Sequence, residues 1–285
     1  MSRQPTHDPL QGPAWLRWSL IALAIVAMAL LVVMPLAMVL GAAFAKGVGV
    51  WFAALSEPDA RAALELTLLT AAIVIPLNAL FGLLTAWAVT RFEFRGKRLL
   101  LALIDLPFAV SPVVAGLCLV LLFGSQGWFA GWLSEHDVKI LFARPAIVLA
   151  TLFITFPFVA RELIPLMQQQ GSDEELAARS LGAGAWTMFR RVTLPNIKWG
   201  LLYGVLLCGA RAMGEFGAVS VVSGHIRGLT NTLPLHIEIL YNEFNSTAAF
   251  AAASLLAGLA LVTLVLKFWL ESRHGDALAQ AGRRH

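Results

Sequence analysis

Six long apolar stretches, separated by polar segments, dominate the pattern of the chain. A transmembrane helix needs about 20 mostly apolar residues. The candidate stretches cover residues 18–45, 66–90, 99–123, 145–167, 198–223 and 244–266. The pattern predicts an all-α membrane protein with six transmembrane helices. We expect a cytoplasmic N-terminal segment (1–17), one six-span domain (18–272) and a cytoplasmic C-terminal tail (273–285).

The composition supports a lipid environment. The 285 residues are 59% hydrophobic and only 13% charged, whereas soluble domains carry roughly 25% charged residues. Cys118 and Cys208 both lie in apolar stretches, so we predict two buried free thiols rather than a disulfide.

The distribution of basic residues sets the expected orientation, because cytoplasmic loops are enriched in Lys and Arg. With the N-terminus inside, fifteen of the 21 basic residues fall in inner segments and five in outer ones; the remaining one, Arg211, lies within a span. Both termini and the long segment 161–198 are therefore predicted to be cytoplasmic. This distribution explains the net charge of +4 better than nucleic-acid binding does.

The segment 161–198 contains the most polar stretch of the chain, GSDEELAARSLGAGAWTMFRRVTLP (171–195). Ser172 and Glu175 have the spacing of a capping box, and Gly182 is a suitable helix end. Trp186, Phe189 and Val192 form a second apolar stripe, and Pro195 suits the first turn of the next span. The pattern predicts two short helices joined at a glycine. They form either a docking surface for another protein or an amphipathic hairpin on the membrane.

Ionisable residues within the spans need a partner or a watery cavity. Arg211 and Glu215 have i, i+4 spacing, so we expect them to pair on one helix face. The pair either locks the bundle or lines a translocation path. Nearby glycines at 209, 214 and 217 allow close helix approach or a break in the helix. Asp105 is expected near the inner end of its span, either solvated or paired with Lys97 or Arg98.

The loop resembles the EAA loop of ABC-importer permeases, which reads Glu-Ala-Ala, three residues, Gly, nine residues, Ile, one residue, Leu-Pro. Here Ala177 and Ala178 are followed at that spacing by Gly182, then by Val192, Leu194 and Pro195. Leu176 occupies the position of the motif's Glu, and Glu175 precedes it. A one-residue offset rotates a side chain by about 100°. Either Glu175 compensates from the neighbouring face, or the loop docks with one fewer charged contact.

The resemblance implies the type I (MetI-like) importer permease fold. It also implies that the loop docks on a separate ATPase subunit. The expected docking residues are Glu174, Glu175, Leu176, Ala177, Ala178, Gly182, Leu194 and Pro195.

A second resemblance indicates the substrate class. ARAMGEFGAVSVVSGHIRG, from Ala210, is similar to a segment of sulfate and molybdate importer permeases. FPFVARELIPLMQQQGS, FRRVTLPNIKWGLLYGV and TLPLHIEILYNEFN resemble sulfate/thiosulfate permeases of the CysW type. The resemblance implies a multi-pass protein of the bacterial inner membrane. Its implied partners are a sister permease, two ATP-binding subunits and a periplasmic sulfate/thiosulfate-binding protein.

The chain is expected to be a transport subunit and not an enzyme. It contains no GxxxxGK[ST] sequence, so we expect the partner ATPase to use ATP and Mg, and this chain to bind no cofactor or metal. Arg211, Glu215 and Arg227 are the candidates for a translocation path or gate. His225 and His236 are expected in loops at the outer mouth.

Two alternatives remain open from sequence alone. One is the same architecture with another oxyanion, such as molybdate. The other is a proton-coupled secondary carrier that uses Asp105, Arg211 and Glu215. The long loop argues against the carrier, in which it has no obvious role.

Overall fold

A computed structural model describes residues 13–281. Helices make up the regular structure of these residues, with the following bounds: α1 Ala14–Met28, η1 Ala29–Val33, α2 Met34–Phe44, α3 Val48–Ser56, α4 Pro58–Arg91, α5 Lys97–Ala109, α6 Pro112–Phe123, α7 Ala130–Glu135, α8 Arg144–Gln170, α9 Asp173–Ser180, α10 Ala185–Met188, η2 Phe189–Thr193, α11 Leu194–Met213, α12 Gly217–Ser223, α13 Leu233–Asn242 and α14 Ser246–Ala281. The segments η1 and η2 are π-helical.

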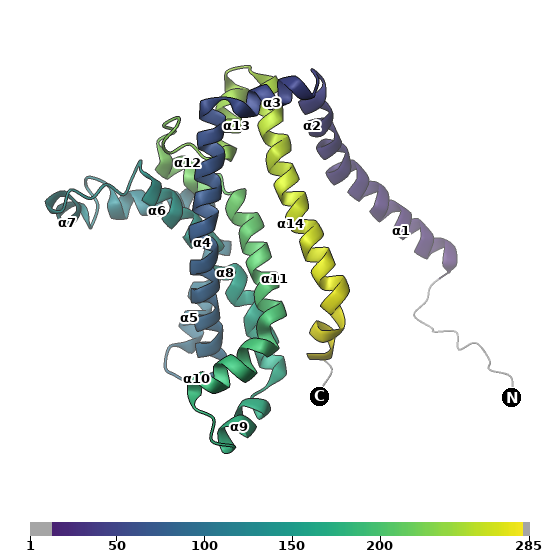
Figure 1. The fold of residues 1–285 in the computed structure, drawn as a ribbon, viewed down its shortest axis with the longest axis vertical. Coiled ribbons are helices and arrows are strands. Elements are labelled where there is room, and N and C mark those ends of the chain that lie inside the picture. Colours follow the sequence, from purple (N-terminus) through teal and green to yellow (C-terminus); the bar gives the residue numbers. More distant parts are fainter. Residues whose placement is uncertain (1–12, 282–285) are drawn as a thin grey trace.

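The core of the bundle is formed by α4, α8 and α11, which run side by side (Figure 1). Small residues permit their close contact, as is common between membrane helices. A Cβ atom on Gly82 of α4 would lie 2.7 Å from the Cβ of Val159 on α8. A Cβ atom on Gly204 of α11 would lie 3.1 Å from the Cα of the same valine. Asn78 donates hydrogen bonds to Thr155 (2.7 Å) and Cys208 (3.5 Å), which ties the three helices together.

The first span lies apart from this core. Helices α1 and α2 slope away from the bundle, and only the α2 end approaches α14 (Figure 1). In the helix from Trp15 to Phe44, no residue of the most apolar segment is buried by the rest of the described chain. The predicted burial of both thiols is half right: Cys208 is buried but Cys118 is exposed, and both are free.

Four described helices are long and apolar enough to cross a membrane alone, and two bent pairs bring the possible number to six. The single helices cover Trp15–Phe44, Pro58–Arg91, Arg144–Gln170 and Ser246–Leu270. The third and the fifth predicted stretches are each broken into two helices, so the number of spans is six if each bent pair is one span.

The two breaks have different local causes. Between α5 and α6 the chain turns by 111° at Val110 and Ser111. Both residues are extended, with ψ of 133° and 137°. Pro112 accounts for Ser111, because a proline disfavours the helical conformation of the residue directly before it. Between α11 and α12 the chain turns by 50°, and Gly214 stands at the break, as one alternative of the glycine prediction proposed.

The long polar connection is shorter than predicted. Helix α8 continues to Gln170, so residues 161–170 of the predicted loop belong to its last turns. The second short helix is not separate, because one helix runs without interruption from Ala185 to Met213 through α10, η2 and α11. Pro195 lies inside this helix, and the π-helical turn before it accommodates the proline ring, as η1 does before Pro35.

Two pairs of short helices lie at opposite ends of the bundle, whereas α7 lies to one side (Figure 1). Helices α9 and α10 lie at one end, whereas α3 and α13 lie at the other (Figure 1). His236 is buried within α13, not in a loop as predicted, while His225 is in the α12–α13 connection as expected.

Candidate functional site

Helix α9 forms from strong local signals at both ends. Ser172 is its N-cap residue, and three acids occupy the first turn, where the helix dipole favours them. At the other end Gly182 adopts φ +87°. The Gly182 N–H donates to the Arg179 carbonyl and the Ala183 N–H to the Ala178 carbonyl, both at 3.0 Å. These two bonds make a Schellman end, so the predicted glycine stop is confirmed.

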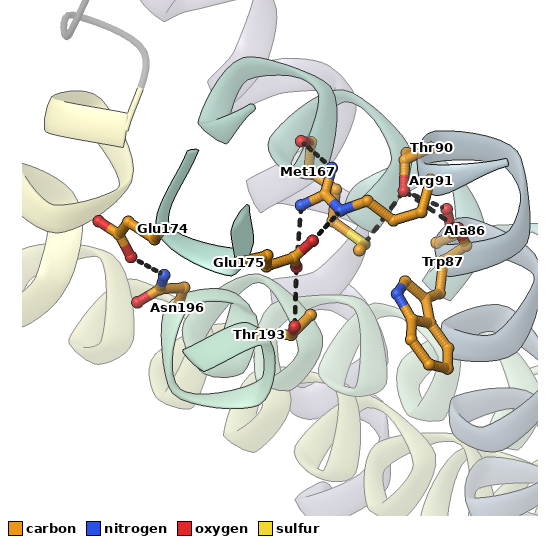
Figure 2. Close-up of polar contacts among 9 residues, drawn as sticks. All are labelled: Ala86, Trp87, Thr90, Arg91, Met167, Glu174, Glu175, Thr193 and Asn196. Carbon is orange, nitrogen blue, oxygen red and sulfur yellow. Dashed lines mark hydrogen bonds and ion pairs between the residues drawn. The ribbon is translucent and has the colours of Figure 1, made fainter. Parts of the chain in front are cut away.

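The predicted capping box is wrong, because the Glu175 carboxylate turns away from the start of its own helix. Arg91, the last residue of α4, contacts both of its oxygens: Nε lies 2.6 Å from Oε2 and Nη2 lies 3.2 Å from Oε1. The hydroxyl of Thr193 in η2 donates to Oε1 at 2.7 Å. Arg91 also donates to the Met167 carbonyl of α8 at 3.2 Å (Figure 2).

We call Arg91, Met167, Glu175 and Thr193 the inner cluster. The side chains of Arg91 and Glu175 are only 13% and 10% exposed, and Thr193 is 2% exposed. The cluster joins α9 to the ends of α4, α8 and the helix that contains α11 (Figure 2). The cluster thus connects α9 to all three helices of the core.

A second set of polar contacts, outside the inner cluster, also holds α9. The side-chain amide of Asn196 donates to Glu174 (Figure 2). The backbone carbonyl of Asn196 accepts a hydrogen bond from the Gln170 side chain at 3.0 Å. These contacts hold α9 between the end of α8 and the start of α11.

Three large apolar side chains of the loop are exposed among its charged residues. Leu176, Leu181 and Trp186 are 60%, 88% and 71% exposed. We call these three residues the apolar face of the loop. Ala177 and Pro195 are also exposed, whereas Ala178 and Leu194 are half-buried. Trp186 stacks on Phe189 at 5.8 Å, and Phe189 contacts Trp87 of α4 at 5.3 Å.

Sequence reasoning missed Arg91 and Thr193. Arg91 is one of four basic residues between 91 and 98, and nothing in the local pattern distinguishes it. The only available signal was the acid at 175, one position before the motif's Glu. A buried acid requires a partner, and a search for that partner would have led to the basic ends of the neighbouring helices.

The predicted Arg211–Glu215 pair is present, with Nη1 2.6 Å from Oε2. The Glu215 side chain is 1% exposed and that of Arg211 is 34% exposed. Glu215 lies in the break after α11, and its Oε1 accepts a hydrogen bond from the Ala218 N–H of α12 at 2.9 Å. The carboxylate therefore joins the two halves of the broken span.

The two broken spans contact each other beside their breaks. A Cβ on Gly217, at the start of α12, would lie 2.9 Å from the Cβ of Pro112, at the start of α6. A Cβ on Gly116 would lie 2.8 Å from the Ala218 carbonyl oxygen. This close packing agrees with the prediction that glycines of this region allow close helix approach.

The other predicted charges have different partners from those expected. Asp105 pairs with Arg161 of α8 at 2.9 Å, whereas Lys97 pairs with Glu93 at 2.6 Å, so the expected Asp105 partners are wrong. Arg227, the third path candidate, lies near α13, at the end of the bundle opposite to α9 (Figure 1). Its guanidinium contacts Glu243 and lies 3.8 Å from Asp59.

Comparison with known proteins identifies the family. Residues 78–275 match the family described as binding-protein-dependent transport system inner membrane component. The chain belongs to this family. The sulfate transport system permease protein CysW of Escherichia coli K12 is 52% identical over 259 residues, which cover 91% of this chain and 89% of that protein. Its Synechocystis counterpart is also 52% identical, with 91% and 94% covered.

A second type of permease is related at lower identity. The sulfate transport system permease protein CysT of E. coli K12 is 40% identical over 221 residues, covering 78% of this chain and 80% of that protein. Among solved structures, a bacterial ABC transporter involved in alginate import has a chain with TM-score 0.74 and 16% identity, covering 91% of this chain and 94% of that one. The fold is therefore that of an ABC importer permease.

Proposed function

We propose that this chain is a permease subunit of an ATP-driven importer that carries sulfate and thiosulfate across the bacterial inner membrane. The 52% identity to CysW proteins over most of both chains supports this substrate class. The observation that carries the coupling part of the proposal is the inner cluster, which attaches α9 to three core helices while its apolar face stays exposed.

The membrane arrangement follows from the charge distribution and the bent pairs. We propose six passes, with the third and fifth broken, and a cytoplasmic location for both termini and the α9 end; the enrichment of basic residues in these segments supports this arrangement. The α13 end then faces the periplasm. We use inner and outer for these two ends from here on.

The exposed apolar face of the loop suits a cleft in the ATPase partner. Two ATP-binding subunits would use ATP and Mg and move toward each other, and the docked loops would move with them. Because the inner cluster is buried and fully hydrogen-bonded, α9 and the ends of α4, α8 and α11 would move as one body. The result is a two-state, rigid-body change of the core.

Two further partners complete the proposed importer. The relationship to CysT proteins supports a sister permease of similar fold. A periplasmic sulfate/thiosulfate-binding protein would deliver the anion, and a similar alginate transporter has been solved in complex with a periplasmic protein. Cofactor chemistry is assigned to the ATPase partner alone.

Uptake into proteoliposomes tests this function. The complete complex, with its periplasmic protein, is expected to import radiolabelled sulfate only when ATP is present. With ATP held constant, an uncoupler should leave the rate unchanged. Uptake that persists without the ATPase and collapses with the uncoupler would establish a proton-coupled carrier instead. Faster uptake of molybdate than of sulfate would reassign the substrate.

A further inference from the structure

The connection between α12 and α13 lies at the outer end of the bundle. We call its exposed part, residues 224–229, the outer strap; from Thr230 onward the connection is buried. The Thr230 hydroxyl donates to the Ser223 carbonyl at 2.6 Å and accepts from the Ile226 N–H at 3.2 Å. These bonds give the strap a defined shape.

Three polar side chains lie buried where the strap enters α13. Asn231, Thr232 and His236, which we call the outer polar cluster, are 2%, 4% and 2% exposed. Both polar atoms of the Asn231 amide, the Thr232 hydroxyl and both His236 ring nitrogens lack a hydrogen-bond partner among the residues that the structure describes. Buried polar groups almost always have a partner. The cluster therefore lacks the group that would complete it.

The position and chemistry of the cluster match an oxyanion. Thr232 is the N-cap of the ten-residue helix α13, and its side chain makes no capping bond. A helix N-terminus carries partial positive charge and favours anions. The Asn231 Nδ2 group and the Thr232 hydroxyl are neutral donors that an anion would satisfy, whereas the Asn231 Oδ1 is an acceptor. Burial lowers the pKa of His236, so at neutral pH its ring is uncharged and adds one N–H donor.

Polar contacts hold the strap against α4 and α13. Arg227, at the middle of the strap, holds Glu243 beyond the end of α13 and lies 3.8 Å from Asp59 at the start of α4. His225 lies 3.6 Å from Glu238. The carboxylates at this rim repel an anion as long as the strap is closed, and the buried cluster is reached only when the strap lifts.

We infer that Asn231, Thr232 and His236 form an oxyanion-binding site that the outer strap closes in this structure and that sulfate reaches when the strap lifts. The site rests on the proposed function, since sulfate is its expected ligand. Neutral donors bind an anion without the strong attraction of a fixed positive charge. Such a site holds sulfate briefly and releases it toward the cytoplasm.

Substitutions that remove the polar atoms but keep the shape test the site. In the purified complete complex, Asn231→Leu and Thr232→Val should each lower ATP-dependent sulfate uptake about tenfold, the effect of one lost hydrogen bond to a charged ligand. Each should also raise the melting temperature by about 2 °C, because an unpartnered buried polar group is removed. A structural role would move stability and uptake in the same direction.

Two control variants separate the site from general damage. Thr232→Ser keeps the hydroxyl and should retain most of the uptake. Thr67→Val removes a hydroxyl that does have partners, since it accepts the Leu233 N–H at 2.8 Å and donates to the Ala63 carbonyl. It should lower the melting temperature. If Thr232→Val also lowers it and leaves uptake unchanged, ordered waters complete the cluster and the inference is wrong.

The reactivity of an introduced cysteine tests, without sulfate, whether the strap closes the site. With Cys118 replaced by serine and the buried Cys208 retained, Asn231→Cys should resist a charged thiol reagent in the nucleotide-free complex. It should react after the complex is trapped with ATP and vanadate. Equal reaction in both states, or none in either, overturns the site. A wild-type complex that imports no sulfate contradicts the proposed function instead, and the thiol result then decides the site alone.

Discussion

The inner cluster and the outer polar cluster are both buried, but they differ in how completely their polar atoms are partnered. In the inner cluster Arg91, the Glu175 carboxylate and the Thr193 hydroxyl bond one another and the Met167 carbonyl. In the outer polar cluster five polar atoms lack partners within the described part of the chain. A fully bonded buried network is rigid, whereas an incomplete one marks a place that another group must fill.

The difference assigns separate tasks to the two ends. The inner cluster suits a connection that transmits movement, because breaking it leaves a buried charge without its partner. The outer polar cluster raises the free energy of the closed form, so less binding energy is needed to open it. A permease that alternates between two states needs both a stiff connection and a closed state that is easily left.

The largest expected effect is the loss of the arginine from the inner cluster. Arg91→Met leaves the Glu175 carboxylate buried with only the Thr193 hydroxyl, and should lower the free energy of unfolding by about 3 kcal/mol. Sulfate uptake per ATP hydrolysed should fall with it. Denaturant unfolding and coupled uptake of the purified complex measure the two quantities.

Two variants control for this result. Lys97→Met removes an i, i+4 pair whose Glu93 side chain is 89% exposed, and should cost about 0.5 kcal/mol or less. The double variant Arg91→Met, Glu175→Leu removes both buried charges and should recover much of the lost stability. A single Arg91→Met variant as stable as the wild type would mean that the inner cluster contributes nothing to rigidity.

The same substitution at the two ends sharpens the comparison. Thr193 and Thr232 are both nearly fully buried, but the first hydroxyl donates to a carboxylate and the second has no partner. Thr193→Val should destabilise the chain by about 1.5 kcal/mol, since it removes a hydrogen bond to a charged group. Thr232→Val should stabilise it by about 1 kcal/mol. Melting curves of the two variants test this difference. Shifts of the two melting temperatures in the same direction would contradict it.

A smaller effect is expected at the end of α9. Gly182 has φ +87° and a Cβ would meet no atom within 4 Å, so Gly182→Ala introduces backbone strain without a clash. It should cost about 1 kcal/mol. Gly184 is equally open but has φ −69°, so Gly184→Ala should be close to neutral. Equal melting temperatures for the two variants would show that the glycine end of α9 is not required.

The apolar pattern predicted most of the fold because spans depend on local composition. The second, fourth and sixth apolar stretches became the long helices α4, α8 and α14, each longer than predicted because helices extend beyond the apolar core. The break at Ser111 was not predicted, although Pro112 was visible. A proline in a span can kink a helix or end it, and which one occurs depends on the packing of α6 against α12.

The site was predicted only in outline, for a similar reason. The glycine end of α9 and the Arg211–Glu215 pair depend on neighbours within four or five residues, and both were found. The role of Glu175 depends on Arg91, which is 84 residues away in the chain. The outer polar cluster likewise depends on how the strap folds over α4. Contacts between distant segments leave no periodic signal in a single sequence.

The smallest effect on the stability of the chain is expected at Leu176, the residue in place of the motif's Glu. The Glu175 carboxylate is engaged by Arg91 and Thr193, so it does not compensate on the outward face, and Leu176 is 60% exposed. Leu176→Glu should therefore change the free energy of unfolding by no more than about 0.5 kcal/mol. If the ATPase partner buries this leucine, association should weaken about tenfold, since a buried Leu contributes about 1.5 kcal/mol or more. Titration of the detergent-purified permease with ATPase subunit measures this, with Arg179→Glu as a control for added negative charge on the same helix. Tighter binding of Leu176→Glu would instead show that the partner retains a site for the family's acid.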